Sequence, residues 1–215
     1  YFFFFSYIIA TTYSQTLLLF YFFKNGLSVM GLLFYVLIQC LSALLIYFIF
    51  RERSIESRTS LFWGIVSSAS GVLVASLMTH PYHAFIVSFL FGITNVFFWT
   101  LYNSLYFKYS LKEEHGFKSG IYFLIFPIVG AVFSPLSGFV VEKFSFSFLF
   151  MSSFLFYLIP LFFTFYLPSF IFKFEVHKAL NELENKTLVF MQGYISMFKF
   201  GFITIFTLLF ITTPF

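Results

Sequence analysis

Four amide side chains lie within long apolar stretches of this sequence: Gln15, Gln39, Asn95 and Asn103. An amide group both donates and accepts hydrogen bonds, and burying one without partners costs on the order of 1 to 3 kcal/mol. Each amide is therefore expected to face a polar partner or water. Two interpretations remain open: the amides line a pathway for a small polar molecule, or they hydrogen-bond neighbouring helices and hold them together.

A second candidate site is a loop cluster of charged residues, Arg51, Glu52, Arg53 and Arg58, which follows an apolar stretch. Salt bridges in such a loop can close one side of a membrane pathway and break when that side opens. This interpretation makes the cluster a cytoplasmic gate. The alternative is that the arginines only fix the orientation of the chain in the membrane.

Other reactive side chains do not form a recognisable site. His80 and His83 flank Pro81 without a cysteine or acid nearby, so no metal site is predicted. The sequence contains no phosphate-binding loop and no nucleophile motif, and we expect neither a cofactor nor an enzyme. The turn at residues 112–115, Lys-Glu-Glu-His, is the only acid–base group that an alternative function, a polytopic membrane enzyme, could use. A non-transporting membrane assembly factor is the other alternative.

The composition indicates whether the protein lies in water or in a lipid bilayer. Of 215 residues, 60% are hydrophobic and 9% charged, against about 25% charged in soluble domains. We therefore expect an integral membrane protein in contact with the lipid bilayer, and no nucleic-acid partner. Phe occurs 41 times, so aromatic stripes carry little functional information. The single cysteine, Cys40, lies in an apolar stretch and is interpreted as a packing residue.

Stretches of about 20 apolar residues are long enough to cross a bilayer as helices. The predicted fold is an all-α integral membrane protein with a six-helix transmembrane bundle and a seventh transmembrane helix. The bundle covers residues 1–168, a linker with a short amphipathic helix covers 169–187, and the seventh helix covers 188–215. The six helices of the bundle are expected at residues 1–23, 27–50, 60–79, 84–107, 117–141 and 146–167.

Positive charges alternate between the loops. The loops after the second, fourth and sixth stretches carry nine basic residues: Arg51, Arg53, Arg58, Lys108, Lys112, Lys118, Lys173, Lys178 and Lys186. The loops after the first, third and fifth stretches carry two, Lys24 and Lys143. Cytoplasmic loops of membrane proteins carry the excess of Lys and Arg. The N-terminus is therefore predicted in the cytoplasm, with the protein in a cell membrane (plasma or inner).

The fifth stretch is interrupted by Gly130, Ser134, Pro135 and Gly138. Small residues let a neighbouring helix approach closely, and a proline kink is tolerated where neighbouring groups satisfy the freed backbone. Gly130 and Gly138 share one helix face to within about 80° at 3.6 residues per turn. We expect this face to be a packing or hinge surface.

This arrangement resembles the N-terminal half of a major facilitator superfamily transporter, followed by the first helix of its second half. The residues Gly130, Ser134, Pro135 and Gly138 are similar to the family's fifth-helix motif G-x-x-x-G-P-x-x-G-G, with Ser134 in place of one glycine. The stretch from Leu19 to Leu33, with a turn at residues 24–28, is similar to the family's turn from the first helix into the second. Glu52 and Arg53 resemble the acidic and basic pair in the family's loop between helices two and three, and Arg58 resembles a later basic residue of that loop.

The resemblance implies secondary active transport of a small molecule by alternating access. It also implies that the six-helix bundle works with a C-terminal bundle of the same chain. Because the sequence begins at Tyr1 without an initiator methionine, we expect a fragment of a longer transporter.

Overall fold

The computed structural model describes residues 2–109 and 115–173 of the chain. This part is mostly helical and contains six segments that are long and apolar enough to cross a membrane. We number them one to six in chain order: Phe2–Lys24, Val29–Phe50, Ser57–Ser76, His83–Tyr106, Gly120–Lys143 and Phe146–Thr164. They agree with the six helices predicted for the bundle to within a few residues at each end. The predicted amphipathic helix of the linker and the seventh helix lie outside the described residues.

Two of the six segments are not continuous α-helices. Segment one consists of α1 (Phe2–Gln15) and α2 (Leu18–Lys24), separated by a turn at residues 16–17. Segment four begins as α5 (His83–Thr94), continues as the π-helix η1 (Asn95–Thr100) and ends as α6 (Leu101–Tyr109). The other four are single helices: α3 (Val29–Phe50), α4 (Ser57–Ser76), α7 (His115–Lys143) and α8 (Phe146–Thr164).

Local sequence explains where several helices begin. The Ser28 side chain accepts a hydrogen bond from the Gly31 N–H at 3.1 Å and caps α3. The Ser145 side chain caps α8 in the same way, through the Phe148 N–H at 3.1 Å. Between segments one and two, Gly26 has a φ of +92°, which a residue with a side chain rarely adopts. The chain can therefore reverse direction in a short turn.

The fold departs from the all-α prediction at one place in the described residues. Strands β1 (Ser54–Glu56) and β2 (Ile171–Lys173) pair antiparallel, with Ser54 opposite Lys173 and Glu56 opposite Ile171. The loop after segment two and the chain after segment six leave the bundle at the same end, where both are extended. Each strand satisfies the backbone groups that the other would expose. We call this end of the bundle the strand end.

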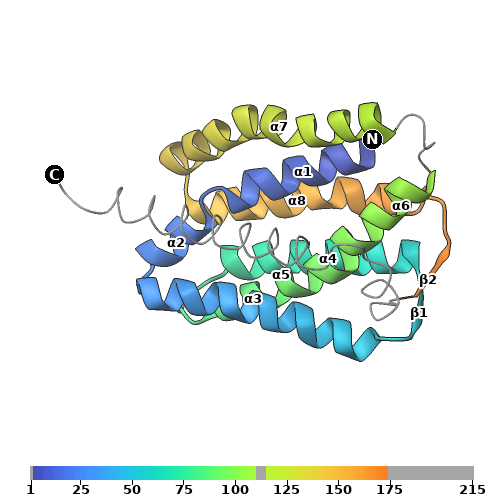
Figure 1. Cartoon of the computed structure of the whole chain (residues 1–215). Coiled ribbons are helices and arrows are strands. Elements are labelled where there is room, and N and C mark those ends of the chain that lie inside the picture. The colour runs from blue at the N-terminus through green and yellow to red at the C-terminus, as the bar shows by residue number, and fades with distance from the viewer. Residues whose placement is uncertain (1, 110–114, 174–215) are drawn as a thin grey trace. The chain divides into compact units, whose positions relative to one another are not determined.

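The first three and the last three segments have matching packing partners (Figure 1). Segment one packs on five and six, through α1 with α7 and α8, and segment four packs on two and three, through α5 with α3 and α4. Segments three and six pack on each other, through α4 and α8. Exchanging the first three segments with the last three maps these five most extensive pairings onto one another. The bundle therefore has the pairing expected of two related three-helix units with opposite orientation.

Basic side chains differ in number at the two ends of the bundle. At the strand end, Lys108 lies over the Phe170 ring, with its Nζ 4.1 Å from the centroid, so the ends of segments four and six are close. At the opposite end, Lys24 lies 5.5 Å from the Phe146 ring centroid. Among the described residues, the strand end carries Arg51, Arg53, Arg58, Lys108 and Lys173, and the opposite end carries Lys24 and Lys143.

Candidate functional site

The centre of the bundle holds a cluster of buried hydroxyl groups. The Tyr7 hydroxyl lies 3.4 Å from Ser68 Oγ, which lies 3.0 Å from Thr94 Oγ1. The Tyr157 hydroxyl donates to Thr11 Oγ1 at 3.2 Å. Because the hydroxyls come from α1, α4, α5 and α8, this cluster joins segments one, three, four and six at their centre. Each polar group has a partner, so burial of the cluster carries little desolvation penalty.

Segment three fits closely against the π-helix. A Cβ atom on Gly64 would lie 2.8 Å from the Phe98 backbone nitrogen, so only glycine allows this approach. One turn earlier in α4, the Ser60 hydroxyl donates to the Phe97 carbonyl oxygen at 3.1 Å. A π-helix leaves the regular α-helical hydrogen-bond pattern, and Ser60 supplies a donor to one of its carbonyl groups. The wide turn in segment four is thus held in place by segment three.

Further hydroxyl-to-carbonyl bonds continue along the same contact. Ser67 donates to the Leu90 carbonyl at 2.8 Å, and Thr94 donates in the opposite direction to the Gly64 carbonyl at 3.0 Å. On the other side of α5, Ser88 donates to the Tyr35 carbonyl of α3. Small hydroxyl residues therefore hold segment four to both of its neighbours, a type of contact that also joins tightly packed helices in membrane proteins.

Two of the predicted pathway amides lie at the irregular points of the fold. Gln15 is the last residue of α1, immediately before the turn in segment one, and its side chain is exposed. Asn95 is the first residue of the π-helix in segment four, and it is exposed as well. Segments one and four are also the pair related by the exchange of the two three-helix units. Gln15 and Asn95 therefore occupy similar positions. Each amide lies where the first segment of its three-helix unit loses its α-helical regularity.

The other two amides lie differently. Gln39 is half-buried in α3, and its backbone carbonyl lies against Gly92, one turn before Asn95. Asn103 lies two turns beyond Asn95 in α6, where its Oδ1 accepts a hydrogen bond from the Tyr122 hydroxyl at 3.1 Å. Asn103 thus connects segment four to segment five, as the second interpretation of the amides predicts. The structure brings Gln39 near the level of Asn95 and places Asn103 closer to the strand end.

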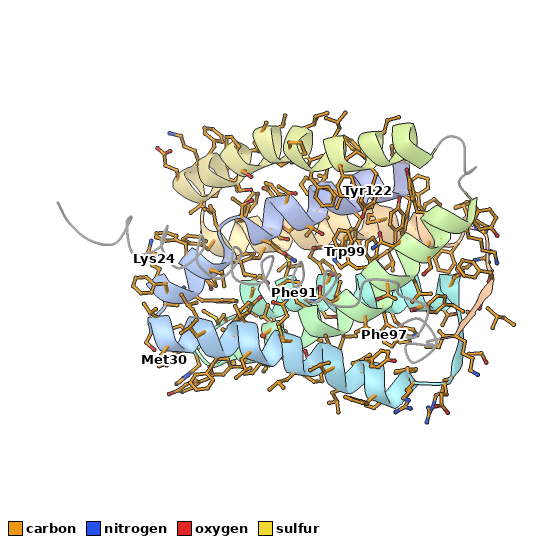
Figure 2. All side chains as sticks on the ribbon, viewed as in Figure 1. Lys24, Met30, Phe91, Phe97, Trp99 and Tyr122 are labelled. Carbon is orange, nitrogen blue, oxygen red and sulfur yellow. The ribbon has the colours of Figure 1, made fainter. Side chains whose placement is uncertain are left out.

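Aromatic rings surround the side of the π-helix that carries these amides. The Trp99 ring stacks on Phe126 of α7 with centroids 6.0 Å apart, and meets Phe4 and Tyr7 of α1 edge to face. Trp99 and Tyr122 are both labelled in Figure 2, where they come from segments four and five. The Trp99 side chain itself is half-buried. Part of the Trp99 ring is therefore packed against these aromatic neighbours, while the rest of the ring is exposed.

The four residues of the predicted gate do not act as one group in this structure. Arg51 Nε lies 3.5 Å from Glu52 Oε1, both side chains being exposed, and this contact joins neighbours in the chain rather than two segments. The Arg53 guanidinium lies 5.9 Å from the centroid of the Phe50 ring. Arg58 instead donates from Nε and Nη2 to the Leu167 carbonyl oxygen, at 3.2 and 2.8 Å. Arg58 thus binds the stretch of chain that follows segment six.

Several other contacts hold the same stretch of chain after segment six. The Glu56 carboxylate accepts hydrogen bonds from Ser169 Oγ at 2.6 Å and from Thr59 Oγ1 at 2.8 Å. The Ser169 bond, and after it the Thr59 bond, lower the pKa of Glu56 from its ordinary value of 4.5. Ser57 exchanges hydrogen bonds with Phe170, donating from its N–H at 2.9 Å and accepting through Oγ at 3.1 Å. We refer to residues 54–59 and 167–173, with these bonds, as the clasp.

The two glycines of the fifth-segment motif do not provide a packing surface among the described helices. A Cβ atom on Gly130 or Gly138 would have no neighbour within 4 Å, so the expected close approach of another helix there is not present. Segment five packs through an adjacent face instead, where Ser137 Oγ donates to the Tyr13 carbonyl at 2.9 Å. Ser134 reaches Thr16 Oγ1 at 3.1 Å, and Pro135 is exposed within α7. Ser134 and Ser137 therefore connect segment five to segment one, while the two glycines make no close contact.

Comparison of the chain with protein-family models, with curated proteins and with solved structures finds no match. No group of three or more His, Cys, Asp or Glu side chains in the described ranges is arranged to hold a metal ion.

Sequence reasoning missed the hydroxyl cluster and the small-residue face of segment three. The spacing Ser60, Gly64, Ser67, Gly71 and Ala75 repeats small residues every three or four positions and was a usable signal for close helix packing. The hydroxyl cluster had no such signal, because isolated Ser, Thr and Tyr residues are common in helices of every kind.

Proposed function

We propose that the six segments form one half of a secondary transporter that moves a small molecule across a membrane by alternating access. The bundle pairs with a second bundle of the same protein, as in major facilitator superfamily transporters. In this mechanism each bundle moves largely as a rigid body, and the substrate site lies between the two, near the middle of the membrane.

The correspondence of Gln15 and Asn95 is the observation that carries this proposal. Transporters built from inverted repeats bind substrate where helices are discontinuous, at matching positions of the repeats. Here the packing pairs are exchanged between two three-helix units, and the first segment of each unit is irregular beside an exposed amide. The Gln15 side chain has a partner among the described residues, the Tyr157 hydroxyl. An exposed amide in an apolar segment has further hydrogen-bonding groups, which a substrate or water in a central pathway would satisfy.

The clasp and the hydroxyl cluster fit the rigid-body requirement. The hydroxyl cluster joins segments one, three, four and six at their centre, and the clasp ties the end of segment six to the loop after segment two. Elements joined in this way move together. The excess of basic residues at the strand end supports a cytoplasmic position for that end, and for the N-terminus, which belongs to the same end.

Transport by purified full-length protein in liposomes tests the proposal. A panel of radiolabelled sugars, amino acids and carboxylates is offered, with empty liposomes as the baseline. We expect uptake of at least one solute, and Gln15→Ala and Asn95→Ala are each expected to reduce that uptake at least tenfold without loss of folded protein. Asn25→Ala is the matched control, since the Asn25 amide donates at 2.8 Å to the Tyr21 carbonyl in the turn outside the bundle.

Two outcomes would contradict the proposal. One is folded protein that takes up no member of the panel. The other is uptake that both amide variants and the Asn25→Ala control leave equally unchanged, which would show that Gln15 and Asn95 do not face the transported molecule.

A further inference from the structure

One face of segment four carries Asn95, Trp99 and Asn103 at intervals of four residues. Residues four apart lie on the same side of a helix, one above the other. Asn95 and Trp99 lie in the π-helix, whose wider turn still leaves them on that same side. The Asn95 side chain is exposed, and those of Trp99 and Asn103 are half-buried. The three side chains therefore present two amides with an indole ring between them. We call this set the segment-four face.

The indole ring is held in a fixed orientation. Its neighbours are Phe126 at a centroid distance of 6.0 Å and an interplanar angle of 21°, Tyr7 at 5.9 Å and 77°, and Phe4 at 6.1 Å and 82°. Contacts of this geometry are favourable for aromatic pairs, and three of them leave the ring little freedom to rotate. A ligand that packs on the open part of Trp99 meets a surface that is already ordered.

The two amides offer different hydrogen-bonding groups. Asn103 Oδ1 is occupied by the Tyr122 hydroxyl at 3.1 Å, which leaves the Asn103 amino group as a donor. No described residue forms a hydrogen bond with the Asn95 side chain, so its carbonyl oxygen and amino group are both available. The segment-four face thus provides donors and an acceptor on both sides of an apolar ring.

Charge is absent from this part of the bundle. Within the six described segments, the Lys, Arg and Glu residues, Lys24, Arg58, Glu142 and Lys143, all lie in the first or last two positions of their segments. A charged ligand beside Asn95 would lose hydration, and no described residue there carries an opposite charge to compensate for that loss. A purely apolar ligand would leave the amides without partners, which is unfavourable as well.

We propose that the segment-four face is one wall of a binding site for an uncharged carbohydrate. Hydroxyl groups of a sugar both donate and accept, as the two amides require, and the C–H face of a sugar ring packs on an aromatic ring. This inference rests on the proposed transport function and specifies the class of its substrate. The amides bind the hydroxyl groups, Trp99 contacts the ring, and no charged residue of the six described segments lies beside them to bind an ion.

Tryptophan fluorescence of the purified full-length protein in nanodiscs tests this proposal. Glucose, maltose and mannitol are the neutral probes, and citrate, lysine and tetraethylammonium are the charged ones. We expect a saturable change in emission with a neutral probe only. The change is expected to disappear in Trp99→Phe and to persist in Trp63→Phe, since Trp63 is 55% exposed on α4 and serves as the matched control. In Asn95→Ala the dissociation constant is expected to rise about tenfold for the loss of about one hydrogen bond to a ligand.

The results separate failure of this inference from failure of the proposed function. A response to tetraethylammonium, lysine or citrate in place of the neutral probes would overturn the carbohydrate assignment, as would a neutral-probe response that Trp99→Phe retains. Absence of any response in a protein that transports another class of solute would overturn it as well, while leaving the transport function intact. Absence of both binding and uptake in folded protein would contradict the transport function too.

Discussion

Gly64 of α4 faces the backbone of Phe98 so closely that a Cβ atom on Gly64 would lie 2.8 Å from the Phe98 nitrogen. This contact places segment three directly against the π-helix of segment four. It occurs beside the Ser60 bond to the Phe97 carbonyl and the Thr94 bond to the Gly64 carbonyl. The irregular helix and the glycine therefore form one structural unit, which positions Asn95 and Trp99.

The first prediction concerns this contact. Gly64→Ala is expected to lower the free energy of unfolding by about 1 to 3 kcal/mol, because the new methyl group meets backbone atoms that cannot move separately from the helix. Gly130→Ala is the matched control. Its methyl group meets nothing within 4 Å, so we expect no loss, and a gain of up to about 1 kcal/mol from helix propensity. Unfolding in mixed detergent micelles measures both values. Equal effects of the two substitutions would contradict the described packing.

The second prediction concerns Arg58. Because its guanidinium donates twice to the Leu167 carbonyl, Arg58→Ala is expected to loosen the clasp. The measurement is disulfide formation between Ser54→Cys and Lys173→Cys, which face each other in the β1–β2 register, in a Cys40→Ala background. We expect slower formation in Arg58→Ala than with Arg58 present.

Two controls accompany that measurement. Arg51→Ala is expected to leave the rate unchanged, since Arg51 contacts only the adjacent Glu52 among described acidic side chains. The off-register pair Ser54→Cys with Ile171→Cys is expected to react more slowly than the paired positions. Similar rates for both pairs would show that the strands do not pair in this register.

The third prediction concerns pH. The hydrogen bonds from Ser169 and Thr59 lower the pKa of Glu56 below its ordinary value of 4.5, so the folded clasp favours the ionised carboxylate. Its contribution to clasp stability is therefore present above pH 4.5 and is lost as the pH falls through the lowered pKa. Spin labels at positions 54 and 173 report the separation of the strands. We expect a separation that increases on acidification in the wild-type clasp and is independent of pH in Glu56→Gln. A pH response retained in Glu56→Gln would assign the effect to another group.

Local sequence determines some elements of this fold, and contacts between distant segments determine the others. The six long helices could be predicted because length and hydropathy alone identify them. The pairing of β1 with β2 could not be predicted, because strands of three residues have no periodic signal. The two strands follow segments two and six and meet only in the folded bundle. The π-helix was missed for a similar reason: it is stabilised by Ser60 and Gly64 of a different segment.

Individual site residues show the same distinction. Gln15 and Asn95 were recognised as amides in apolar surroundings, but only the structure shows that both lie where a segment loses its α-helical regularity. The grouping of Arg58 with Arg51, Glu52 and Arg53 followed their closeness in sequence, whereas the Arg58 side chain bonds to residue 167. The small size of Gly130 and Gly138 predicts close packing, but α7 contacts α1 through Ser137 and the following turn through Ser134.

Access of water to the middle of segments one and four tests the central claim most directly. Single cysteines replace Gln15, Asn95 or Trp63 in full-length protein without other cysteines, and a membrane-impermeant maleimide is applied from each side of sealed vesicles. Alternating access predicts that the cysteines at positions 15 and 95 react from both sides, whereas position 63, on the outer surface of α4, does not react. If positions 15 and 95 remain unreactive from both sides in folded protein, the two segments do not line a transport pathway.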